Sequence, residues 1–130
     1  MPTMGELKTA AHLEEIIALS QTQPVLVFKH SRTCPISQNA YAQVKRAQER
    51  GLLTLPVFCL VVQDARSIAN EVARRWGIRH ESPQVLLVYR DKVVYHASHW
   101  GIQPAEIQKQ AERVNDHPPA RTDENPHVQP

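Results

Sequence analysis

The stretch Ser31-Arg32-Thr33-Cys34-Pro35-Ile36-Ser37 lies just after the apolar run Val25–Phe28, at a point where the sequence pattern changes from strand to helix. The run is short, apolar and rich in β-branched residues, which is typical of a central strand. From Pro35, apolar residues recur every three or four positions up to Gly51, which predicts a helix. Proline suits the first helical position because its missing N–H is not needed there. The sequence therefore predicts that Cys34 lies between the end of a buried strand and the first turn of a helix.

The rest of the chain predicts further strands and helices in alternation. They are a short edge strand at 7–9, helices at 11–19 and 68–76, a buried strand at 57–62, a hairpin of strands at 85–89 and 93–97, and a last helix at 102–114. A βαβαβ half followed by a ββα half predicts an α/β fold with a central mixed β-sheet flanked by helices on both faces. This is the thioredoxin-like order, and it places Cys34 at the carboxyl edge of the sheet, where open α/β sheets carry their sites.

The length and charge of the chain limit the classes of function. A chain of 130 residues is enough for one domain. We assign this domain to residues 1–114, and we expect the polar, proline-rich residues 115–130 to form a disordered tail. The net charge of +2 is scattered and forms no basic stripe, so we expect no nucleic-acid partner. Without an apolar run of membrane-spanning length or a signal peptide at Met1–Lys8, we expect no membrane partner and a cytoplasmic location.

The two cysteines lie in different surroundings. Cys59 falls within the apolar run 57–62 and is expected to be a small core residue on a strand buried on both faces. Cys34 is expected at a helix N-terminus, where free N–H groups and the helix dipole favour a thiolate. Such a sulfur is also released readily from a mixed disulfide. The sequence therefore indicates catalysis at Cys34, not at Cys59.

Ser37 stands where a dithiol oxidoreductase carries its second cysteine. An alcohol cannot displace a thiolate from sulfur, so an external thiol must resolve an adduct on Cys34. We count Ser37 as a catalytic residue that is able to donate a hydrogen bond to the Cys34 sulfur. The alternative is that Cys34 and Ser37 are ordinary residues of a first helical turn.

Other residues are expected to line the site and contact the substrate. Ser82 and Pro83 precede the hairpin, where a cis peptide bond would face the cysteine and the Ser82 backbone would pair with an extended substrate. The alternative is a trans proline that begins a strand. The remaining candidates are the neighbours of Cys34 and a cationic and aromatic rim, namely Thr33 and Pro35, then His30, Arg32, His99 and Trp100. The rim residues are alternatively plain strand-end residues. No spacing typical of a metal site occurs, so no metal is expected.

Several motifs together resemble the YtxJ family, the monothiol bacilliredoxins, over roughly residues 5–112. They are Lys29–Ser37, Ser67–Ala73, His80–Gln84 and His96–Trp100. The resemblance implies a cytoplasmic thioredoxin-like oxidoreductase that removes bacillithiol, a small anionic thiol, from bacillithiolated proteins. It maps the active cysteine onto Cys34 and the serine of the monothiol motif onto Ser37. Bacillithiol is then the thiol co-substrate, and bacillithiol or another redoxin is the reductant.

Three other functions stay open at this point. The same one-thiol chemistry suits a redoxin for glutathione or coenzyme A. A non-catalytic protein would use Cys34 as a ligand of an iron–sulfur cluster, although Pro35 and Ile36 replace the Gly-Phe that is usual in such carriers. A thiol sensor would accept a protective adduct on Cys34 without passing it on.

Overall fold

The computed structural model describes residues 4–116, and these form one mixed sheet with helices on both faces. The strands are β1 (Gly5–Glu6), β2 (Val25–His30), β3 (Val57–Val61), β4 (Gln84–Tyr89) and β5 (Lys92–Ser98). The helices are α1 (Ala10–Ser20), α2 (Pro35–Glu49), α3 (Arg66–Trp76) and α4 (Pro104–Asp116), with a short 3-10 turn, η1 (His99–Gly101). The α/β fold class predicted from the sequence is confirmed.

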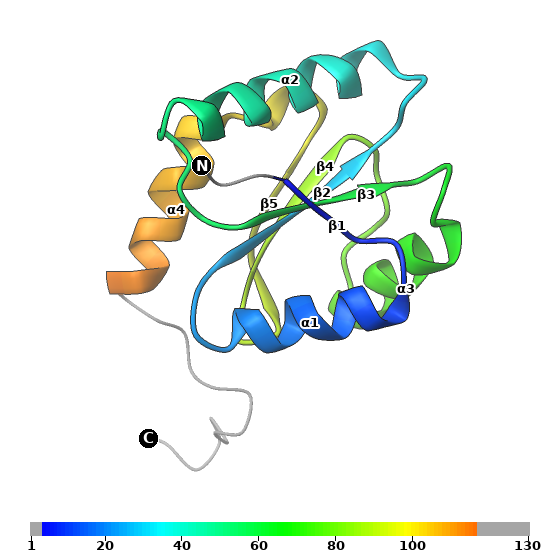
Figure 1. Cartoon of the computed structure of the whole chain (residues 1–130), viewed down its shortest axis with the longest axis horizontal. Helices are drawn as coiled ribbons and strands as arrows, with labels where there is room; N and C mark the ends of the chain where they lie inside the picture. The colour runs from blue at the N-terminus through cyan, green and yellow to red at the C-terminus, as the bar shows by residue number, and fades with distance from the viewer. Residues whose placement is uncertain (1–3, 117–130) are drawn as a thin grey trace.

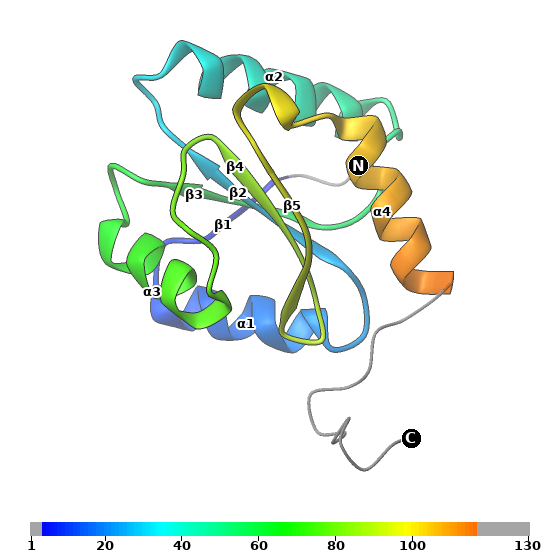
Figure 2. The same cartoon turned by 180° about the vertical axis from the view of Figure 1, so that it is seen from behind.

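The five strands lie in the order β1-β3-β2-β4-β5. β2 pairs parallel with β3, β3 pairs parallel with β1, and the β4–β5 hairpin is antiparallel and adds to the other side of β2. Figures 1 and 2 show α2 and α4 over one face of the sheet and α1 and α3 over the other. The central position of β2 explains why its sequence is a continuous apolar run without alternation.

The side chains of β2 build two cores, one on each face. Leu26 and Phe28 join the core under α2 and α4, and Val25 and Val27 join the core over α1 and α3. β2 ends at the carboxyl edge of the sheet, and the loop that follows it leads directly into α2 (Figure 1). The fold therefore places Cys34 at the edge predicted from the sequence.

The element boundaries differ from the predictions mainly at the chain ends. The edge strand is Gly5–Glu6 and not residues 7–9, and Leu7 is instead a buried core residue. The last helix begins at Pro104, within the predicted stretch 102–114 and with proline at its first position, while Ile102 caps η1. The same helix continues through Asp116, two residues past the predicted end at 114. The predicted tail from residue 117 onward lies outside the described residues.

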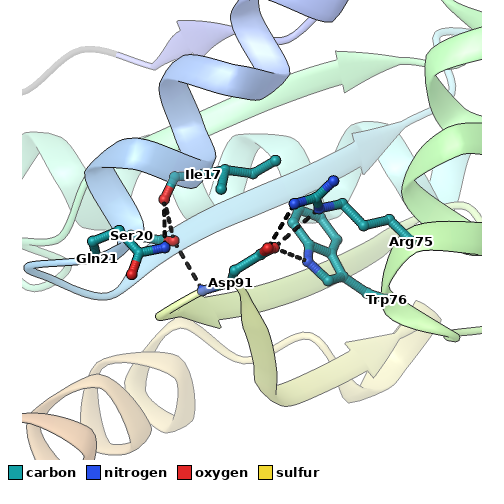
Figure 3. A network of polar contacts seen from close by, with 6 residues as sticks. All are labelled: Ile17, Ser20, Gln21, Arg75, Trp76 and Asp91. Atoms are coloured by element: carbon teal, nitrogen blue, oxygen red, sulfur yellow. Dashed lines mark hydrogen bonds and ion pairs between the residues drawn. The ribbon is translucent and has the colours of Figure 1, made fainter. Parts of the chain in front are cut away.

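The far end of the sheet is held by a network of polar contacts around Asp91 in the β4–β5 turn (Figure 3). Its carboxylate accepts hydrogen bonds from Arg75 Nε at 3.0 Å, from the Arg75 terminal nitrogen at 2.6 Å and from Trp76 Nε1 at 2.8 Å. Its backbone N–H donates to Ser20 Oγ at 3.1 Å. The turn is thereby fixed to both α1 and α3.

Candidate active site

Cys34 is the N-cap residue of α2, with an extended backbone (φ −100°, ψ 117°) and a half-buried side chain. Its carbonyl accepts the first helical hydrogen bond, from Gln38 N–H at 2.9 Å. Because Pro35 has no N–H, Ile36 and Ser37 supply the free N–H groups of the first turn. The thiol is therefore accessible and lies where a helix N-terminus stabilises negative charge.

Ser37 is fully buried on the inner side of α2, and its hydroxyl group is engaged away from the cysteine. Its Oγ lies 2.7 Å from His30 Nδ1 and accepts a hydrogen bond from Ser31 N–H at 2.9 Å. When the Ser37 O–H donates to Nδ1 of a neutral imidazole, all three groups are satisfied. Within residues 4–116 no hydrogen bond joins Ser37 to the Cys34 sulfur, so that expectation is wrong.

His30 lies in the interior and is not a cationic rim residue. Its side chain is buried, and its ring stacks on Tyr41 with 4.8 Å between centroids. Burial and the neighbouring Arg32 lower the pKa of His30, so the imidazole is neutral at neutral pH. The predicted positive charge at this position is therefore wrong, because β2 continues through His30 and carries the side chain under α2.

Arg32, Thr33 and Pro35, which we expect to contact the substrate, are exposed around Cys34. Arg32 donates to Asp64 Oδ2 at 2.5 Å, and this hydrogen bond raises the pKa of Arg32 and lowers the pKa of Asp64. Gln63 supports the loop by accepting from Arg32 N–H at 3.2 Å. The Arg32 cation therefore flanks Cys34 but already has a carboxylate partner.

Ser82 and Pro83 lie beside the loop that carries Cys34. The antiparallel register of β2 and β4 ends at the pair Lys29–Gln84, so Pro83 and Ser82 come just before β4 at the end of the sheet where β2 stops. The Ser82–Pro83 peptide bond is cis, which confirms that prediction. Ser82 Oγ is buried and has no hydrogen-bond partner among the described residues.

The η1 turn brings His99 and Trp100 to the same side of the molecule. His99 N–H donates to the Pro83 carbonyl at 3.0 Å, and η1 packs against α2. The Trp100 side chain is 69% exposed, which is unusual for a large apolar group. These two residues are therefore exposed next to α2 and beside Pro83, which is itself buried.

Cys59 belongs to a separate cavity of about 410 Å³ beneath α2, which His30, Arg32 and Tyr41 also line and Cys34 does not. The thiol is half-buried, so the prediction of a fully buried core residue is wrong. Cys59 is paired with Glu6 of β1, but its side chain lines this cavity and joins neither core cluster of the described residues. Burial, with a smaller effect of Glu6, raises the pKa of Cys59 to about 11.

Lys29 is a buried residue that the sequence predictions did not include. Its side chain is 0% exposed, and its Nζ donates to Gln84 Oε1 at 2.8 Å. Burial lowers the pKa of Lys29 to about 8, while Glu81 acts in the opposite direction. The available signal for this residue was a lysine directly after the apolar run 25–28, because a lysine that continues a buried strand is almost never fully buried without a partner.

Comparison with known proteins gives the family. The sequence profile described as monothiol bacilliredoxin BrxC matches residues 5–107. The chain belongs to this family. Among solved structures, this bacilliredoxin is similar to a candidate oxidoreductase with a thioredoxin fold, at 32% identity and a TM-score of 0.71 over 84% of this chain and 93% of the other.

True thioredoxins share the fold at lower identity. The bacilliredoxin matches Fasciola hepatica thioredoxin at 20% identity and a TM-score of 0.65, covering 85% of this chain and 98% of the other. It matches spinach chloroplast thioredoxin f at 16% identity and a TM-score of 0.64, covering 86% and 93%. The thioredoxin-like fold is therefore shown, together with membership of an oxidoreductase family.

Residues 4–116 contain neither a candidate membrane-spanning helix nor a candidate metal cluster. None of the helices in this part of the chain is both long and apolar enough to cross a membrane. The same residues contain no cluster of three or more His, Cys, Asp or Glu side chains that would hold a metal ion.

Proposed function

We propose that this bacilliredoxin removes bacillithiol from bacillithiolated proteins through a transient mixed disulfide on Cys34. The observation that carries the proposal is the accessible Cys34 at the start of α2 with Ser37, and not a second thiol, in the following turn. The family membership supports bacillithiol as the small thiol. Because both thiols are free, we also propose the reducing cytoplasm as the location.

The reaction consists of two thiol–disulfide exchanges. In the first, the Cys34 thiolate attacks the bacillithiol sulfur of the modified protein, and a new sulfur–sulfur bond forms as the old one breaks. The protein thiolate leaves and takes a proton from water. In the second, a bacillithiol thiolate attacks the adduct on Cys34, which releases the Cys34 thiolate and bacillithiol disulfide. A sulfur stabilised at a helix N-terminus is a good leaving group in this second step.

We propose that the substrate lies across the residues around Cys34. The exposed ones are Arg32, Thr33, Pro35, His99 and Trp100, and the partly buried Ser82 and the buried Pro83 complete the set. The unpartnered Ser82 hydroxyl supports this placement, because a buried hydroxyl without a partner is costly and a bound substrate would supply one. The exposed Trp100 supports it too, since aromatic side chains are frequent anchors of protein partners.

The test is an assay of bacillithiol release from one bacillithiolated protein, with excess bacillithiol as reductant. We expect multiple turnovers with the wild-type protein, no turnover with Cys34→Ala, and unchanged turnover with Cys59→Ala. Full activity of Cys34→Ala would refute the mechanism, and loss of activity in a folded Cys59→Ala variant would make Cys59 a resolving thiol.

The same target protein carrying glutathione or coenzyme A tests the small-thiol specificity. We expect bacillithiol to be removed fastest. Equal or faster removal of one of the other two thiols would reassign the substrate while keeping the Cys34 chemistry. A single turnover that leaves the adduct on Cys34 would instead identify a thiol sensor.

A further inference from the structure

Lys29 is among the largest fully buried side chains of the described residues, and it has one side-chain hydrogen-bond partner there, Gln84 Oε1. Burial of an ammonium group without a carboxylate at hydrogen-bonding distance is costly, and apolar residues of similar volume often serve a core better. Groups placed in this way are concentrated at functional sites. The location of Lys29, at the carboxyl end of β2 and five residues before Cys34, fits such a role.

The partner, Gln84, braces the segment that carries Ser82 and Pro83. Gln84 follows Pro83 directly, and its Nε2 donates to the Arg79 carbonyl at 3.1 Å. The side chain of Gln84 therefore links the two ends of the segment 79–84. Lys29 Nζ donates to the oxygen of the same amide group, so the contact from Lys29 fixes the orientation of the Gln84 side chain.

We propose that Lys29 is a positioning residue of the active site, which holds Gln84 and through it the Ser82–Pro83 segment beside Cys34. The register of β2 and β4 places this segment at the end of the sheet where β2 stops, and in the loop after β2 the Cys34 N–H donates to the Ser31 carbonyl at 3.4 Å. The effect on bacillithiol transfer rests on the proposed function. The coupling between Lys29 and the segment rests on the contacts alone.

The charged groups around Lys29 determine how this contact responds to pH. Glu81 favours the charged form of Lys29, whereas burial disfavours this form and lowers the pKa of Lys29 to about 8. The pKa of His80 is lowered by burial and then by Lys29 and Arg66. His96 of β5 lines a small cavity with Gln84 and Glu81. With a pKa of about 8, about 90% of Lys29 is charged at pH 7 and about 10% at pH 9, and the charged form makes the stronger hydrogen bond.

Lys29→Met tests the proposal, with Lys109→Met on the exposed side of α4 as a control that removes the same charge. At pH 7 we expect Lys29→Met to slow bacillithiol transfer by about ten-fold, because small misplacements in a site are costly. The ratio of wild-type to Lys29→Met rates should fall toward one between pH 7 and pH 9, and titrations shared by both proteins cancel in this ratio. Equal rates at pH 7, or a ratio that does not change with pH, would overturn the proposal.

A double variant tests whether Lys29 acts through Gln84. Lys29→Met with Gln84→Met should be no slower than Gln84→Met alone, since Gln84→Met already removes the contact through which Lys29 acts. The double variant also leaves no unpaired buried charge that would prevent folding. If the double variant is slowed by the product of the two separate effects, the two residues have independent roles, and the proposal that Lys29 acts through Gln84 is refuted.

The amide resonances of Ser82 and Gln84 in an NMR titration separate the two proposals. In the wild-type protein they should shift with a midpoint near pH 8, and Lys29→Met should abolish that shift. A wild-type protein without transfer activity would refute the proposed function, and this titration would still decide the role of Lys29. Absence of the shift in the wild-type protein would refute the coupling whatever the activity.

Discussion

At the scale of single residues, the two thiols are separated by their surroundings. Cys59 has a pKa of about 11, so about one molecule in ten thousand carries its thiolate at pH 7. Cys34 is accessible at a helix N-terminus. We expect iodoacetamide to alkylate Cys34 at least about ten-fold faster than Cys59 in the native protein, because the thiolate is the reacting form. Peptide mass spectrometry measures both rates in one sample, and equal rates would contradict the assignment of Cys34.

The Ser82 hydroxyl gives a second prediction at this scale. Removal of a buried hydroxyl without a partner relieves a cost, so Ser82→Ala should leave the free energy of unfolding unchanged or raise it by up to about 1 kcal/mol. If the substrate supplies the missing partner, the same change should slow transfer by about five-fold, the equivalent of one hydrogen bond of about 1 kcal/mol. Denaturant unfolding and the transfer assay measure the two effects.

Ser67→Ala is the matched control for Ser82→Ala, because Ser67 is an exposed serine of α3. It should change neither stability nor transfer. A loss of stability in Ser82→Ala would mean that the hydroxyl has a partner in the folded protein. Unchanged transfer would remove Ser82 from the proposed substrate surface.

At the scale of helices and strands, the sequence correctly predicted the elements that local residue patterns determine. The strand from Val25 is a continuous apolar run and the helix from Pro35 has apolar periodicity, and both lie where the sequence indicates. The helix stop at Gly51 also agrees with its left-handed backbone, φ 71°. The edge strand Gly5–Glu6 was misplaced because two residues contain no periodic signal.

Errors within the site came from contacts between elements. The partner of Ser37 is His30, seven residues away on another element, and neither position has a pattern that indicates the pair. The partial exposure of Cys59 depends on the cavity that its side chain lines, which residues of several elements form. The Lys29–Gln84 contact joins residues 55 positions apart. Sequence reasoning located the loop that carries the candidate cysteine, whereas the supporting contacts required the tertiary structure.

The Asp91 network yields a prediction about how elements are joined. Burial opposes ionisation of Asp91, but hydrogen bonds from Arg75 and Trp76 outweigh it and lower the pKa. Asp91→Asn should reduce the free energy of unfolding by roughly 1–3 kcal/mol at pH 7, because it weakens hydrogen bonds to a charged group. The pKa of the Asp91 carboxyl is lower in the folded protein than its value near 3.8 in the unfolded chain, so the charged carboxylate stabilises the fold above about pH 3.8. This stabilisation is lost as the pH falls through the pKa of the folded protein.

Denaturant unfolding of both proteins at several pH values checks this prediction. The difference between wild type and Asp91→Asn should be constant from neutral pH to about pH 5 and shrink below about pH 4. Asp64→Asn is the matched control, because it breaks another Asp–Arg pair that is exposed and should lose less stability. Equal losses, or a difference that grows in acid, would contradict the role of Asp91.

At the scale of the whole molecule, the sheet separates stabilising contacts from reacting groups. Asp91 joins the hairpin turn to α1 and α3 at the end of the sheet where β2 begins. Cys34 lies at the end where β2 stops, with Pro83 and η1 beside it. Variants at the first end should therefore change unfolding without changing transfer, which makes the two properties separable by experiment.

The buried hydroxyl of Ser37 has a kinetic consequence for the whole protein. The chain has two cysteines, and Cys59 lines a cavity to which Cys34 does not contribute, so an adduct on Cys34 is not cleared from within this site. Under the proposed function, regeneration is then a bimolecular step whose frequency is proportional to the concentration of free small thiol. At steady state, the share of molecules that carry an adduct rises as that pool is depleted. A monothiol arrangement thus makes the occupancy of one sulfur a measure of how much reduced thiol the cell has left.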